Sequence, residues 1–253
     1  MHIVVALGAV DGEIVRPVLG DDCVLIENPT DADMSEAVGA IVRASVVVDR
    51  AMFDRMPSLR VLARTGVGTE RVDLDAATER GIPVVITPGS NTRAVAEGAL
   101  AMALTLVKSL PALDAVVRAG GWAERDGIPV GDIDGATVGI VGYGRIGQRL
   151  AEIMSALGAR VRAFDPVTPV PPEYRVENLD DLLRESSIVS LHVPLLDSTR
   201  NIIDARALVR SAGPIDRIRL VADRNPIQHV LDFEPLGSWP VLAFRIRMEQ
   251  GSP

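Results

Sequence analysis

The sequence predicts an α/β protein built on two parallel sheets. Short apolar runs rich in Val and Ile alternate with stretches whose apolar residues recur at helical spacing, as far as about residue 208. Alternation of this kind is typical of parallel sheets covered by helices on both faces. A long helical stretch separates an early series of runs from a later one. We therefore expect two doubly wound domains, the second of them truncated.

Five apolar runs predict the strands of the first domain, at residues 3–7, 23–26, 40–42, 59–63 and 84–86. Helical spacing predicts helices over 51–56 and 74–80. The second of these should end at Gly81, because glycine readily adopts the left-handed conformation that closes a helix. Residues 1–92 are the expected first domain.

A helical segment over 91–117 should open the second domain, with a kink at Pro111. A glycine-rich polar loop over 118–134 follows it. Strands are then predicted at 137–141, 160–164 and 188–192, with a short one near 174–176. Residues 93–208 are the expected second domain, and 209–253 form a divergent tail in which 219–222 could add one strand.

Composition and charge exclude several classes of protein. The formal net charge is −8 and no basic run occurs, which argues against nucleic acid as a partner. Cys23 is the only cysteine, so neither a disulfide framework nor a cysteine-based metal site is expected. No apolar run reaches membrane-spanning length, and residues 1–7 are too short for a signal peptide core. We expect a cytoplasmic protein without a membrane partner.

Three glycines directly follow the run at 137–141 and form the most informative motif. Gly142 would make the turn out of the strand, Gly144 would let backbone approach a pyrophosphate, and Gly147 would let the next helix pack on the sheet. Arg145 and Ile146 open that helix, whose free N–H groups and positive dipole end would face the phosphates. This arrangement predicts a Rossmann-like dinucleotide site.

Asp165 ends the next apolar run, at the distance where such units carry an acidic residue. It would accept hydrogen bonds from the adenosine ribose hydroxyls and repel a 2′-phosphate, so the predicted cofactor is NAD rather than NADP. The alternative is a glycine-rich turn in another kind of α/β protein. The agreement of strand, glycine spacing, helix and acid favours the dinucleotide site.

Three further segments, 64–73, 81–97 and 190–195, join the glycine motif in resembling the D-isomer-specific 2-hydroxyacid dehydrogenases, with the phosphoglycerate dehydrogenases as the closest subgroup. The resemblance covers about residues 1–208. It implies a flavodoxin-like substrate domain completed by the C-terminal end of the chain, and an NAD domain inserted into it. It also implies hydride transfer between NAD(H) and a small 2-hydroxy or 2-keto acid.

The resemblance also implies roles for individual residues. The backbone of Thr65, Gly66, Val67 and Gly68 would hold the substrate carboxylate, although an ordinary turn has the same glycines. His192 and Pro194 would lie at the cofactor, with a purely structural role for His192 as the alternative. Arg43 and Arg64 are the candidates for a substrate phosphate. Residues 91–122 are the segment through which the family usually forms homodimers.

The chain departs from the family after residue 208. The family uses an Arg in an Asn-Thr-x-Arg-Gly motif, a Glu, and a His in a His-x-x-Gly segment, and none of these motifs is present. Arg224 is the positional candidate for the Arg, because it follows the potential strand at 219–222. His229 and Glu234 have suitable side chains but unrelated neighbours, which favours a surface location.

A frameshift after codon 208 would explain the break, since Lys108 is the only lysine among the basic residues and so points to a GC-rich gene. The missing motifs should then appear when the gene is translated in another frame.

Three functions remain open for the chain. It could be an active dehydrogenase, which would turn over a 2-keto acid with NADH. It could be a relic or regulator that binds NAD without catalysis, with a peptide-binding corepressor as one variant. It could also lack a stable fold, because a sheet without its later strands exposes an edge and apolar helix faces.

Overall fold

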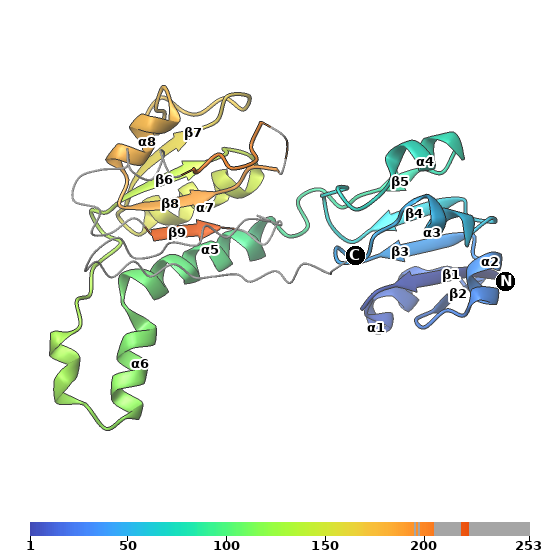
Figure 1. Cartoon of the computed structure of the whole chain (residues 1–253), viewed down its shortest axis with the longest axis horizontal. Helices are drawn as coiled ribbons and strands as arrows, with labels where there is room; N and C mark the ends of the chain where they lie inside the picture. The colour runs from blue at the N-terminus through green and yellow to red at the C-terminus, as the bar shows by residue number, and fades with distance from the viewer. Residues whose placement is uncertain (195, 197, 205–218, 223–253) are drawn as a thin grey trace. The chain divides into compact units, whose positions relative to one another are not determined.

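The computed structural model describes residues 1–194, 196, 198–204 and 219–222, the last four through their backbone. The chain divides into two compact units, one from Met1 to Asn91 and one that begins at Thr92 (Figure 1). The sequence placed this boundary one residue later.

A five-stranded parallel sheet forms the first unit, in the order β2-β1-β3-β4-β5. Its strands are β1 (His2–Leu7), β2 (Cys23–Ile26), β3 (Gly39–Val42), β4 (Val61–Arg64) and β5 (Val84–Val85). All five predicted strands are present, with ends within two residues of the prediction. The chain moves outward from β1 to β2 and then returns to the other side of β1, so the direction of winding reverses between β1 and β3.

Short helices connect these strands: α1 (Gly12–Val15), the 3₁₀ helix η1 (Arg16–Val18), α2 (Asp31–Glu36), α3 (Arg50–Asp54) and α4 (Leu74–Glu79). The sequence predicted α3 and α4 but not α1 or α2, which are too short to show a helical period. A signal for α2 was nevertheless available. Thr30 and Asp33 form a reciprocal capping box, and this spacing can be recognised in a sequence.

The alternation of side chains along β1 divides the core of the first unit between the two sheet faces. Val5 and Leu7 pack on one face with residues of α2, α3 and α4, among them Met34 and Phe53. Val4 and Ala6 lie on the other face with side chains from α1 and its surroundings. Burial on both faces explains why the strand reads as a continuous apolar run.

A four-stranded parallel sheet forms the second unit, in the order β7-β6-β8-β9. The strands are β6 (Thr137–Val141), β7 (Arg160–Phe164), β8 (Ile188–Leu191) and β9 (Arg219–Ala222). Its helices are α5 (Thr92–Val107), α6 (Leu110–Arg118), the 3₁₀ helix η2 (Ala123–Gly127), α7 (Arg145–Ala156) and α8 (Leu179–Glu185). Residues of α5 and α7 pack on one face of β6, and residues of α8 pack on the other.

The potential strand at 219–222 is confirmed as β9, which pairs in parallel with β8. The short strand expected near 174–176 is wrong, because Arg175 makes only an isolated bridge with Ala163. In the loop after α6, part of the predicted irregular segment forms the 3₁₀ helix η2.

The long helix predicted over 91–117 is two helices, and the chain breaks before Pro111 rather than at it. Pro111 has no N–H to donate to the carbonyl four residues earlier, so the carbonyl of Val107 accepts instead from the N–H of Gly131 at 2.8 Å. Ser109 turns the chain with φ of 50°, and its hydroxyl donates to the carbonyl of Pro129 at 2.7 Å. Pro111 then lies in the first turn of α6, where a missing N–H costs nothing.

Within the described part of the chain, no single helix has the length and apolar character needed to cross a membrane. Only α5 and α6 taken together, at an angle of 59°, reach that length and composition.

Candidate functional site

The glycine turn between β6 and α7 is shaped by contacts that leave no room for side chains. Gly142 has φ of 93°, and a Cβ atom there would lie 2.5 Å from the carbonyl oxygen of His192. A Cβ on Gly147 would collide with the carbonyl of Gly142, so α7 can pack this closely on the turn only with glycine. At Gly144 a Cβ would meet nothing within 4 Å. Two of the glycines therefore allow packing, and the third leaves open space at the start of α7.

The start of α7 is suited to an anion. Its N-cap is Gly144, so no side chain caps the free N–H groups, and its first turn contains no acidic residue. Arg145, the first helical residue, is exposed. The positive end of the helix dipole repels the Arg145 guanidinium at this position. An anion bound there would be attracted by the dipole, by the free N–H groups and by the guanidinium together. Ile146 follows Arg145 and is half-buried.

Asp165 follows β7 and joins that strand to the glycine turn. One carboxylate oxygen accepts from the N–H of Tyr143 at 2.7 Å, and the other accepts from the N–H groups of Val167 and Thr168 at 2.8 Å each. Burial by itself raises the pKa of Asp165, but these backbone hydrogen bonds outweigh it and lower the pKa. The carboxylate is thus ionised and fixes the turn. It retains lone pairs that could accept from ribose hydroxyls.

His192 follows β8, next to the glycine turn. Its backbone N–H donates to the carbonyl of Val141 at 2.7 Å, and its ring Nε2 lies 2.8 Å from the hydroxyl of Ser190. The ring Nδ1 is buried and has no partner among the described residues. Burial lowers the pKa of His192 to about 4, so the imidazole is neutral. It can exchange hydrogen bonds with a ligand but supplies no positive charge.

The sequence interpretation missed Ser190, which is 1% exposed and holds the imidazole of His192. Ser190 lies in β8 and His192 directly follows that strand, and a spacing of two along extended backbone puts both side chains on one face of the sheet. Pro194, farther along, is exposed, and its carbonyl accepts from the hydroxyl of Thr199.

These residues meet at the reversal point of the second sheet. β6 lies between β7 and β8, so the turns after β6 and β8 lie at the same edge of the sheet, at the carboxyl ends of the strands. Open α/β sheets bind their ligands at such points. The geometry therefore fits a dinucleotide whose phosphates lie at Gly144 and Arg145 and whose ribose lies near Asp165.

The turn after β4 in the first unit offers a second anion-binding backbone. The N–H of Thr65 donates to the carbonyl of Val42 at 3.0 Å, and the N–H of Gly66 donates to the carbonyl of Arg64 at 2.9 Å. The N–H groups of Val67 and Gly68 donate to no residue that the structure describes. Two of the four predicted carboxylate donors are thus free, and two are engaged in the turn.

Arg64 leads into this turn and is an unusual buried cation. It is 5% exposed, its Nε donates to the carbonyl of Gly68, and its Nη1 is buried without a partner in the described chain. A buried charge without a counterion is costly, so the site favours an anionic ligand. Arg43 is exposed where β3 ends.

The candidates for catalysis, Arg224, His229 and Glu234, lie outside the described residues. Within the described ranges, no group of three His, Cys, Asp or Glu side chains is arranged to hold a metal ion.

Comparison with known proteins identifies similar chains. Residues 100–212 match the sequence model of the D-isomer specific 2-hydroxyacid dehydrogenase, NAD binding domain. The chain is 41% identical over 184 residues to a D-3-phosphoglycerate dehydrogenase of Mycobacterium bovis, covering 71% of this chain and 35% of that protein. A hydroxypyruvate reductase of Thermotoga maritima is 34% identical over 173 residues, covering 67% and 56%.

A solved structure of the D-lactate dehydrogenase of Aquifex aeolicus, complexed with NAD and lactic acid, has a similar fold. Its TM-score is 0.74 at 25% identity, and the match covers 87% of this chain and 68% of that one. The chain spans about a third of the length of the mycobacterial relative.

Proposed function

Because the chain belongs to the D-isomer-specific 2-hydroxyacid dehydrogenase family and carries its NAD-binding domain, we propose that it transfers a hydride between NAD(H) and a small 2-hydroxy or 2-keto acid. The observation that carries the proposal is the uncapped start of α7, where the open space at Gly144 and the exposed Arg145 lie beside an ionised Asp165. NAD, when bound, supplies the hydride acceptor.

Residues of the second unit bind the cofactor, and residues of the first unit bind the substrate. In the second unit, the N–H groups at the start of α7 hold the diphosphate, Asp165 binds the ribose, and neutral His192 offers a hydrogen bond without charge. In the first unit, the N–H groups of Val67 and Gly68, which donate to no described residue, hold the substrate carboxylate.

The buried guanidinium of Arg64 adds positive charge at the substrate turn, with Arg43 as a second basic group for a phosphorylated substrate. Polarisation of the substrate carbonyl and the proton transfer fall to residues outside the described part of the chain. Arg224 is the positional candidate for the arginine.

A second function is favoured by one specific observation. The Arg, Glu and His motifs of the family are not found in the sequence. A chain with an intact dinucleotide site and no acid–base group would bind NAD without turnover, as a relic or a regulator.

Substitution of Gly144 by valine tests the cofactor site. A Cβ atom at this position has no protein atom within 4 Å, so the fold should persist, but the valine side chain would occupy the space proposed for the phosphates. We expect G144V to weaken NADH binding, measured by cofactor fluorescence, at least tenfold. Gly127 in η2 also has open space around it, and G127V is the matched control that should bind normally. Equal binding by G144V and the wild type would reject the site.

Turnover separates the two functions. The chain would be assayed with NADH and pyruvate, hydroxypyruvate or 3-phosphohydroxypyruvate as oxidant. Oxidation of NADH with any of them supports the dehydrogenase. Normal NADH binding without turnover across the panel supports the non-catalytic NAD-binding protein.

We further propose that the protein works in the cytoplasm and forms a homodimer through residues 91–122. Supporting the dimer, α6 contains no buried residue, while Leu110 and Val117 on it and Trp122 just beyond it are exposed.

A further inference from the structure

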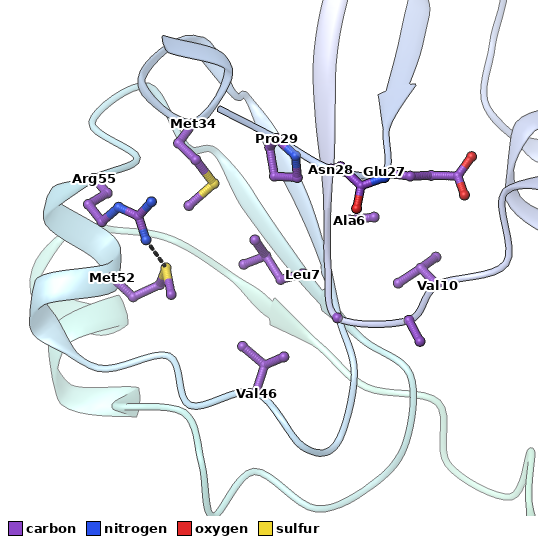
Figure 2. A pocket seen from close by; sticks show the side chains of 12 residues that line it. Ala6, Leu7, Val10, Glu27, Asn28, Pro29, Met34, Val46, Met52 and Arg55 are labelled. Atoms are coloured by element: carbon purple, nitrogen blue, oxygen red, sulfur yellow. Dashed lines mark hydrogen bonds between the residues drawn. The ribbon is translucent and has the colours of Figure 1, made fainter. Parts of the chain in front are cut away.

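A cavity of about 610 Å³ opens at the carboxyl ends of β1, β2 and β3 in the first unit (Figure 2). Neither the turn at 65–68 nor the residues proposed to bind NAD line it. It lies where the winding of the sheet reverses, between β1 and β3. Crevices at such points are the usual ligand sites of open α/β sheets, and this volume is within the usual range for small-molecule pockets.

The wall of the cavity is apolar and polar in nearly equal measure, and aliphatic and methionine side chains form its apolar part. Leu7 at the end of β1 and Met34 of α2 are largely buried, while Val46 and Met52 are half-buried and face the same space. The two methionines have flexible, polarizable side chains that adapt to ligands of different shape. Gly8 has φ of 90°, and a Cβ there would lie 2.9 Å from a methyl group of Val46, so backbone borders the cavity at this point.

Two charged residues line opposite sides of the cavity (Figure 2). Glu27 forms an ion pair with Arg16, which compensates its charge. Arg55 bonds to Asp31 at 2.6 Å and to the sulfur of Met52 at 3.8 Å. The side chain of Asp31 is 89% exposed, so this pair is held weakly, and the guanidinium has further donors.

We propose that this cavity binds a small amphipathic carboxylate, with its apolar body against Met34, Met52 and Val46 and its carboxylate on Arg55. A single planar guanidinium matches a carboxylate through two parallel hydrogen bonds. Among the described residues that line the cavity there is no lysine or second arginine to neutralise a dianion such as phosphate. The proposal is independent of the dehydrogenase activity, since it uses none of the residues assigned to NAD or to the substrate.

The probe for the test is 3-phenylpropanoate, added to the full chain labelled with ¹³C at the methionine methyl groups. We expect saturable shifts of the Met34 and Met52 signals, assigned by substitution. Loss of the guanidinium in R55Q should weaken binding at least tenfold. Arg60, an exposed arginine just before β4, gives the matched control R60Q, which should bind as the wild type does.

Two further measurements test whether the probe binds in this cavity and whether its carboxylate is needed. Ala9 lines the cavity at an exposed position, so A9W should fill the space and abolish the shifts while NADH binding persists. The neutral 3-phenylpropanamide should bind at least tenfold more weakly than the carboxylate. The proposal is overturned if neither methionine signal shifts saturably, or if R55Q and the amide both match the wild type and the acid.

Discussion

Asp165 accepts hydrogen bonds from three backbone N–H groups, so one carboxylate fixes both the end of β7 and the turn that starts α7. The sequence assigned this residue to the ribose alone. The structure adds a supporting role, and the two are compatible because a carboxylate accepts several hydrogen bonds. Positioning by backbone N–H groups also keeps the carboxylate ionised when no ligand is bound.

Low pH should lower the stability of the second unit against unfolding, because Asp165 becomes protonated. Its pKa is lowered in the folded state, so its stabilising effect is complete above the unfolded value of about 4 and is lost as the pH falls through the folded value. We expect D165N, which cannot ionise, to lose less stability than the wild type between pH 5 and pH 3, measured by urea unfolding. Parallel pH profiles for the two proteins would contradict this.

His192 should titrate far below an ordinary histidine. Burial lowers its pKa to about 4, so the stability that it contributes is complete above about pH 6.5 and is lost as the pH falls toward 4. An NMR titration of the three histidines should show one ring that stays neutral at pH 5. The assignment comes from H192N, in which that signal should disappear.

At the scale of elements, short helices in the first unit depend on their caps. The side chain of Asp73 accepts from the N–H of Ala76 at 2.8 Å at the start of α4, a helix of only six residues. Such a helix cannot be stable by itself, and its cap is part of what fixes it.

Removing that cap should destabilise the first unit. We expect D73A to lower the free energy of unfolding by about 1 kcal/mol, measured by urea titration. Asp75, in the first turn of the same helix but exposed, gives the control D75A, with a change of about half that or less. A larger effect in D75A than in D73A would mean that charge rather than capping stabilises α4.

At the scale of the whole molecule, the proposed dimer predicts a dependence of mass on concentration. Val117 of α6 is 44% exposed, and a charge there would have to be buried in an interface. We expect sedimentation of V117E to show a monomer at concentrations where the wild type is a dimer. Val18 in η1 is 81% exposed and gives the control V18E, which should leave the mass unchanged. A monomeric wild type at every concentration would reject the dimer.

Patterns within short segments predicted most strands and the principal helices, because neighbouring residues in the sequence determine whether such an element forms. The run at 137–141 is apolar on both faces, and the glycines after it have a fixed spacing. The break before Pro111 was misplaced by a few residues, since the carbonyl of Val107 found its partner in Gly131, far along the chain. Likewise, Arg175 was predicted within a strand, but a single bridge to β7 is all that forms.

The sequence by itself determined the class of fold, the dinucleotide motif and the family, because glycine spacing, apolar period and the acid at the end of β7 are properties of short segments. Only the tertiary structure decided the strand orders, the cavity beside Arg55, and the buried nitrogens of Arg64 and His192 that have no partner among the described residues. These depend on which segments meet, and residues distant in sequence set the burial and the hydrogen-bond partners of each group.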